Sequence, residues 1–413
     1  MSRLWYDHPA SEWEEALPIG NGRIGAMVYG GTDRERLQVN EESIWLGGPV
    51  NRHNPDAKEN LPKIRQLLRD GRIPEAEHLM ETALSACPEG MHPYQTLGDV
   101  QFFFDGIEGG RERKSGKLRD MILCEGTKHY ERCLDLETAI CRTEFAVGDS
   151  IYEREIFASH PADCLVMRFR TRGKGKVNFL AKLRRESWFD GTCKVGENGI
   201  RLYGNLGRGG YEFAMELRAV STCGRILTQG ECLRAEEVVL WFTADSTYHY
   251  SIPEKDRYAE AYLKAGRELP VGLDEELTGS ARTEFLYQMA MQALLAEKMD
   301  QRLKAAMLLS YDTLKAEHVA DHKSLYDRFV FEVEGAERYE NLPTDLRLER
   351  LRKGKQEHAE QTEDVGLMKL LTDAILRLLP AGREGCRPHC RDFGIVNFSQ
   401  HGTVSIPSIS IQR

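Results

Sequence analysis

The residues best suited to chemistry lie in two short segments near the amino terminus. The first, LPIGNGRIGAMVYGG (residues 17–31), carries five glycines around Asn21. Backbone amides approach an anion closely where no Cβ intervenes, so one interpretation is a phosphate cradle. No Gly-Lys-Ser/Thr follows, which excludes a P-loop, and no strand precedes the Gly-x-Gly-x-x-Gly spacing. The favoured interpretation is a tight strand-turn-strand at a sheet edge.

The second segment, LQVNEESIWLGGPVNRHNP (residues 37–55), combines amides, carboxylates and an indole. Sugar-binding surfaces use this set, because a ring face stacks on the sugar while amides and carboxylates bond its hydroxyls. A buried tryptophan beside surface acids is the alternative, which the residues alone favour. The candidate substrate-binding residues are Asn21, Asn40, Glu41 and Trp45.

Other chemistry has less support in the sequence. Five histidines lack the i,i+4 or His-x-His spacing of metal ligands, so a metal site is not expected; they are His8, His53, His78, His92 and His160. No Gly-x-Ser-x-Gly elbow occurs, so serine-hydrolase chemistry is unsupported. The string CRPHC, with Cys386, His389 and Cys390, has no second ligand pair and is at most a weak zinc signal.

Composition limits the function classes. The 413 residues are 41% hydrophobic and 29% charged, with a net charge of −9. This is globular composition for two or three domains, and no basic field for nucleic acid is present. No apolar run reaches the roughly 18–20 residues of a membrane helix, and no secretory signal is visible. Ten scattered cysteines indicate reduced thiols in a cytoplasmic protein.

The elements that must position these residues change in type near residue 275. Before it, short β-type runs alternate with turn signals, which predicts an antiparallel two-sheet sandwich. One helical pair with a break at Gly71 is predicted within residues 56–86. After residue 275 the apolar spacing is helical. The predicted strands are 100–104, 144–158, 165–171, 177–183, 212–220 and 236–244, and the predicted helical stretches are 285–294 and 303–329.

Residues 1–371 resemble a known enzyme family. The strings LWYDHPASEWEEALPIGNGRIGAMVYGG, LQVNEESIWLGGPVNRHNPDA and YQTLGDVQFFF resemble the amino-terminal domain of glycoside hydrolase family 95, chiefly inverting α-L-fucosidases. HVADHKSLYDRFVFEVEG resembles the family's linker helix, and residues 342–371 resemble the entry to its (α/α)6 barrel. The resemblance implies a sandwich over 1–270, a helical linker over 271–341 and the start of an incomplete barrel over 342–371.

The resemblance also bears on activity. An inverting hydrolase needs an acid and a base that flank the glycosidic bond. In the family, a barrel Glu is the acid, and two barrel Asn residues with an Asp hold the water. None of these positions matches this sequence, so no catalytic residue is expected in this chain, and no cofactor or metal. The implied partner is a fucosylated oligosaccharide or glycan, with no nucleic acid and no membrane.

Three alternatives stay open beside a catalytically incomplete α-L-fucosidase. The chain could be a free-standing carbohydrate-binding or interaction module without catalysis. It could be completed by a separately encoded barrel. An α-glucan phosphorylase shares the sandwich-plus-barrel plan, although the amino-terminal strings argue against it.

The sequence after Leu371 departs from the family. Permitted codons for residues 388–397 and 400–413, read in one shifted frame, give ALQGLWN and SKYTININTE, two strings typical of the family in the family's order. We therefore expect residues 372–413 to be translated out of frame after a small insertion or deletion near Thr372. This expectation makes the CRPHC string an accident of translation.

Overall fold

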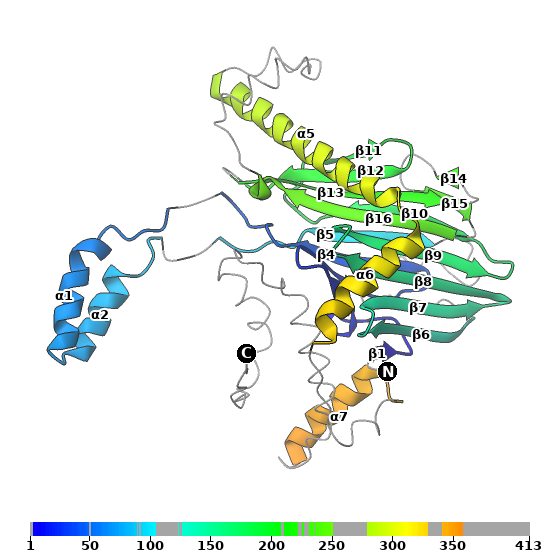
Figure 1. Cartoon of the computed structure of the whole chain (residues 1–413), viewed down its shortest axis with the longest axis horizontal. Coiled ribbons are helices and arrows are strands. Elements are labelled where there is room, and N and C mark those ends of the chain that lie inside the picture. Colours follow the sequence, from blue (N-terminus) through cyan, green and yellow to red (C-terminus); the bar gives the residue numbers. More distant parts are fainter. Residues whose placement is uncertain are drawn as a thin grey trace.

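The computed structural model describes residues 3–48, 51–88, 92–104, 126–207, 210–221, 237–250, 279–328 and 341–357, with short pieces at 90, 123, 225–226 and 231–235. Two antiparallel sheets form a sandwich (Figure 1), which confirms the predicted fold class. In spatial order, one sheet contains β1 (Arg3–Tyr6), β6 (Thr127–Asp135), β7 (Ile140–Val147), β8 (Ser150–Ser159), β9 (Cys164–Arg172), β16 (Glu237–Ser246), β13 (Glu212–Ser221), β12 (Gly199–Asn205) and β11 (Gly191–Val195). The other contains β14 (Arg225–Ile226), β15 (Glu231–Ala235), β10 (Val177–Arg184), β5 (Gly98–Phe104), β4 (Arg34–Glu41), β3 (Ile24–Val28) and β2 (Leu17–Gly20).

The core lies between the two sheets. Strands such as β4 alternate buried and half-buried residues, as expected when one face of a sheet packs inward. Phe102 of β5 lies 5.0 Å from Phe169 of the opposite sheet and 5.4 Å from Phe179, ring centre to ring centre, edge to face in both pairs. Burying side chains of this kind is worth roughly 1.5–3 kcal/mol each, so these rings hold the sheets together.

The glycine-rich segment forms a strand pair, as predicted. β2 and β3 pair antiparallel, and β2 is the edge strand of its sheet. The predicted single strand 144–158 is wrong, because β7 and β8 form a hairpin whose turn contains Gly148 at φ +57°. A left-handed glycine permits this turn, and the continuous β-type residues on either side concealed it.

Two helices cover the outer face of the larger sheet. They are α5 (Gly279–Met307) and α6 (Tyr311–Tyr326), shown over β13, β16 and β8 in Figure 1. Phe157, Trp241 and Leu303 contribute to a second apolar core beneath them. The predicted stretch 303–329 is therefore divided between two helices. Ser310 separates them because its hydroxyl caps α6 by accepting from the amide of Thr313 at 3.1 Å.

Ion pairs fasten these helices to the sheet. The carboxylate of Glu155 on β8 accepts from Lys315 at 2.8 Å and from the Tyr311 hydroxyl at 2.9 Å, both on α6. Burial opposes ionisation of Glu155, but the hydrogen bonds from Lys315 and Arg142 outweigh it, so the pKa of Glu155 is lowered to about 2. The carboxylate is therefore charged at neutral pH and holds α6 in place.

Other helices lie away from the core. A pair, α1 (Ala57–Arg69) and α2 (Ile73–Ala83), extends away from the sandwich in Figure 1, and its break at Gly71 is the predicted one. The last described helix, α7 (Thr344–Glu357), touches β1, where the Trp5 amide donates to the Thr344 hydroxyl at 2.9 Å. Two 3-10 turns, η1 (Trp13–Glu15) and η3 (Thr247–His249), complete the described elements.

No helix among the described residues is long and apolar enough to cross a membrane. The same part of the chain holds no group of three or more histidine, cysteine, aspartate or glutamate residues that could bind a metal ion. The CRPHC string and the proposed out-of-frame residues 372–413 lie outside the described residues.

Candidate functional site

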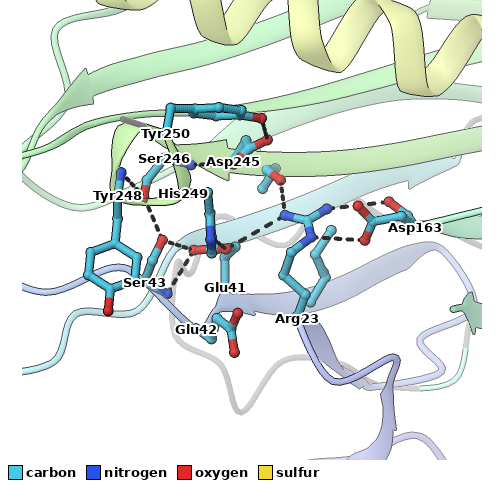
Figure 2. Close-up of polar contacts among 12 residues, drawn as sticks. Arg23, Glu41, Glu42, Ser43, Asp163, Asp245, Ser246, Tyr248, His249 and Tyr250 are labelled. Carbon is cyan, nitrogen blue, oxygen red and sulfur yellow. Dashed lines mark hydrogen bonds and ion pairs between the residues drawn. The ribbon is translucent and has the colours of Figure 1, made fainter. Parts of the chain in front are cut away.

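The two segments singled out by sequence meet where β3 begins and β4 ends, and Figure 2 shows Arg23 of the first beside Glu41 of the second. β3 pairs with β4, which sets Ile24 opposite Glu41 and Gly25 opposite Asn40. The end of β16 and the 3-10 turn η3 from the other sheet complete the site with Asp245 and His249. The site therefore joins both sheets. We call its ionic residues the end cluster: Arg23, Glu41, Asp163, Asp245, His249 and Arg302.

Arg23 is the centre of the end cluster. It is the last residue of the β2–β3 turn, and its side chain is only 16% exposed. Its guanidinium lies 2.8 Å from Asp163 and 3.6 Å from Glu41, and it also donates to the carbonyl of Ala244. Burial alone would lower the pKa of Arg23, but the charges of Asp163 and Glu41 raise it. Arg23 therefore holds a full charge that links the two sheets.

Glu41 is the most deeply buried member of the end cluster, with no exposed side-chain surface. It accepts from the Ser43 amide at 2.9 Å and lies 2.7 Å from His249 Nε2. Burial disfavours the charged imidazole, but the hydrogen bond and charge of Glu41 overcome it, so the pKa of His249 is raised. Protonation of His249 gives three cations for the three carboxylates of the cluster.

Arg302 connects the end cluster to the helical region. This α5 residue lies 2.8 Å from Asp163 and 3.0 Å from Asp245, and Tyr250 donates its hydroxyl to the same Asp245 at 2.6 Å. Burial, and then the hydrogen bond to Asp245, raise the pKa of the Tyr250 phenol, which keeps it a donor. The cluster therefore orients α5 relative to both sheets.

Of the four predicted site residues, Glu41 belongs to the end cluster, and the contacts described for the other three are also to groups of this chain. The Asn21 side chain accepts from the Ile24 amide at 2.8 Å and donates to the Ser159 carbonyl at 3.1 Å. Asn40 accepts from the Leu97 amide at 3.3 Å. Trp45 donates to the Glu42 carbonyl at 3.2 Å. Their role in substrate binding stays a prediction.

The end cluster is suited to positioning more than to acid–base chemistry. Its three carboxylates each lie against an arginine or a histidine, and Glu41 has no access to solvent. Glu42 is the half-buried neighbour, and its pKa is raised by burial and by the charge of Glu41. Sequence reasoning missed Arg23, Asp163, Asp245, His249 and Arg302. Only Arg23 stood within a distinctive string, and the others are separated from it by more than a hundred residues.

A second perturbed carboxyl, Glu212, lies at the start of β13. Its two oxygens accept from Asn205 at 2.5 Å and from Gln292 of α5 at 2.8 Å. Burial raises the pKa of Glu212 more than these two hydrogen bonds lower it, so the pKa is raised to about 7. A carboxyl that is half protonated near neutrality therefore contacts α5 at a second point.

Replacing Glu212 by glutamine should flatten the dependence of stability on pH. The folded protein binds this proton more tightly than the unfolded chain, so the free energy of unfolding falls as pH rises from about 4.5 through about 7. At about 1.4 kcal/mol per pKa unit, the variant should gain roughly 2–3 kcal/mol relative to the parent over that window. Urea titrations at pH 5 and pH 8 measure this gain. A constant difference between the two proteins would contradict the prediction.

The fold and the end cluster define a β-sandwich domain with helices docked by ion pairs. Residues 4–251 match the family described as "Glycosyl hydrolase family 65, N-terminal domain". The match covers more than half of the chain, and the protein belongs to this family.

Two relatives are named as fucosidases. "Alpha-L-fucosidase 2" of Arabidopsis thaliana is 30% identical over 203 residues, which are 49% of this chain and 22% of the relative. "Probable alpha-fucosidase A" of Aspergillus niger is 26% identical over 351 residues, 79% of this chain and 37% of the relative. The chain thus spans well under half of the length of these relatives. A solved "Putative kojibiose phosphorylase from human microbiome" has a TM-score of 0.39 at 11% identity, covering 81% of this chain and 39% of that one, too low a score to support an argument.

Proposed function

We propose that this chain is the amino-terminal part of an inverting α-L-fucosidase of glycoside hydrolase family 95. Support comes from the glycosyl hydrolase domain over residues 4–251 and from the two relatives named as fucosidases. The substrate would be a terminal α-L-fucoside of an oligosaccharide or glycan, cleaved by residues that lie in the part of the relatives that this chain does not match. No cofactor or metal enters the proposal.

We propose that this chain positions other parts of such an enzyme and does not act on the substrate. The observation that supports this role is the end cluster. Glu41 is fully buried, and its carboxylate contacts Ser43, Arg23 and His249. An inverting pair needs two carboxyl groups that reach a substrate from opposite sides with room for a water between them. The end cluster instead fixes the angle of α5 on the sandwich through Arg302. We propose 1–270 as the sandwich, 271–341 as the linker and 342–371 as the entry to a barrel.

The 413-residue chain should release no fucose from p-nitrophenyl α-L-fucoside or 2′-fucosyllactose. Positioned acid and base groups contribute roughly 10²–10⁴-fold each, and the proposed acid and base lie outside the part of the relatives that this chain matches. A gene corrected in frame near Thr372 and continued through the barrel is the positive control, and it should release fucose. Turnover by the 413-residue chain, abolished by Glu41→Gln, would contradict the proposal and place chemistry in the sandwich.

The frame shift is the second part of this proposal. Sequencing the gene across the codon of Thr372 tests it directly. An in-frame gene with no family-like continuation in another frame would contradict it. A cytoplasmic location is proposed on the free thiols of Cys133, Cys141 and Cys164, and cell fractionation tests it.

A non-catalytic carbohydrate-binding module is the alternative function. Large aromatic side chains stand exposed on the sandwich, among them Trp188 and Tyr248 at 52% and 55% exposure. Glycan binding by the chain together with an inactive frame-corrected gene would favour this alternative over the hydrolase.

A further inference from the structure

The loop between β10 and β11 displays two adjacent aromatic side chains. Trp188 is 52% exposed and Phe189 is 42% exposed. Neither belongs to the end cluster or to the segments that the sequence analysis singled out. Large aromatic side chains usually bury most of their surface, so a neighbouring pair left this open marks an interaction surface.

The loop backbone is held firmly. Arg185 donates to the Thr96 carbonyl at 2.6 Å and to the Ser187 carbonyl at 2.7 Å, and its guanidinium lies 4.6 Å from the centre of the Phe213 ring. The Asp190 amide donates to the Tyr203 carbonyl at 2.9 Å. The loop is therefore tied to β12, to β13 and to the segment that precedes β5.

Two features of the backbone show how closely the loop is fitted. Trp188 has φ +57°, a left-handed conformation that is unfavourable for a non-glycine residue. Gly204 of β12 lies so close beneath the loop that a Cβ there would stand 2.6 Å from the Phe189 Cα. The two rings are thus presented by a pre-organised backbone, which lowers the entropy lost on binding.

Two polar residues adjoin the loop and the strand beneath it. Asp190 is exposed and adjoins Phe189 in sequence. Asn205, next to Gly204, donates to Glu212 at 2.5 Å. Carboxylates and amides beside aromatic faces bond sugar hydroxyls while the rings cover the apolar face of the sugar.

The composition of the surface favours a sugar over a protein partner. Among the described residues, the exposed large aliphatic and methionine side chains lie elsewhere: in α1, α2 and the residue after α2 (Leu61, Leu68, Ile73, Met80 and Leu84), near the end of β13 (Val220), beside the α5–α6 junction (Leu308 and Leu309), and in α6 and α7 (Leu325 and Leu346). At the loop, the exposed large apolar residues are both aromatic, and an acid follows them.

We propose that Trp188 and Phe189 form a carbohydrate-binding platform, on which a sugar ring of a glycan stacks and Asp190 accepts from its hydroxyls. The platform rests on the proposed carbohydrate function, but it is separate from catalysis. It would hold a glycan on the sandwich, away from the bond that the rest of an enzyme cleaves.

Saturation-transfer NMR and isothermal titration of the 413-residue chain with L-fucose and 2′-fucosyllactose test the platform. We expect binding of the oligosaccharide, with saturation of the sugar ring protons. Trp188→Asn should weaken it at least about tenfold, since asparagine tolerates the left-handed backbone but supplies no ring face. Trp188→Phe keeps a ring and should lose less. Trp13→Ala is the matched control, because Trp13 is 46% exposed on η1 and should bind as the parent does.

The outcomes separate this proposal from the proposed hydrolase. Equal binding by Trp188→Asn and the parent, or no binding of either sugar by the folded parent, overturns the platform whatever the fucosidase assay gives. Tenfold weaker binding by Trp188→Asn supports the platform even if the frame-corrected gene proves inactive. Circular dichroism of each variant confirms that a loss of binding is not a loss of fold.

Discussion

Replacing Arg154 by methionine should lower the free energy of unfolding by about 3–5 kcal/mol, the usual cost of leaving a buried charge without its partner. Arg154 is 3% exposed and lies 3.3 Å from the fully buried Glu35. It also donates to the carbonyls of Gly31 and Thr32, and stacks 3.8 Å from the centre of the Phe104 ring. Burial raises the pKa of Glu35 and Arg154 opposes this rise, so the variant leaves an acid that must take up a proton or destabilise the fold.

Urea titration of the variant measures this loss, and two further variants test its cause. Glu35→Gln in the Arg154→Met background should recover part of the stability, since the remaining partner is then neutral. Arg72→Ala is the matched control, because its ion pair with Glu75 is exposed and such pairs contribute little to stability. A loss for Arg154→Met no greater than that of Arg72→Ala would show that the buried pair is not needed.

Replacing Arg23 by alanine should lower the free energy of unfolding by about 3 kcal/mol and loosen α5. The variant removes the cation between Glu41 and Asp163, and it withdraws the donor to the Ala244 carbonyl. Glu41 keeps Ser43 and His249, which limits the cost. Because Asp163 also binds Arg302 of α5, the effect should reach the helix.

Hydrogen exchange distinguishes this mechanism from general destabilisation. Amides of α5 near Arg302 should exchange faster in Arg23→Ala, while amides of α6, held separately by Glu155, should change less. Arg302→Ala should reproduce the effect on α5. Uniform acceleration across the sandwich in both variants would mean that the end cluster does not position the helix.

The sequence identified the elements with strong local patterns. Alternating β-type runs predicted the strands around Phe102 and Phe242, and the apolar spacing around Gly71 predicted the α1–α2 pair. It could not place the turn at Gly148 or the break before Ser310, because the apolar pattern continues across both. A helix or strand ends there because of a left-handed glycine or a capping hydroxyl, and the spacing of apolar residues does not reveal either one.

In the candidate site, too, the sequence predicted which segments matter but not which side chains contact one another. The two distinctive amino-terminal strings singled out Asn21 and Glu41, and they predicted that both residues bind a sugar. The pairing of β3 with β4 and the end of β16 instead bury Glu41 beside Arg23 and His249.

By itself, the sequence determined the two-sheet sandwich, the helical region after it and the family resemblance, because these follow from residue periods and continuous strings. Only the tertiary structure decided which charges are buried together and which aromatic rings are exposed. The sequence does not show whether a glutamate faces solvent or an arginine more than a hundred residues away. The free energy of burying the glutamate depends on that partner, so only the tertiary structure decides it.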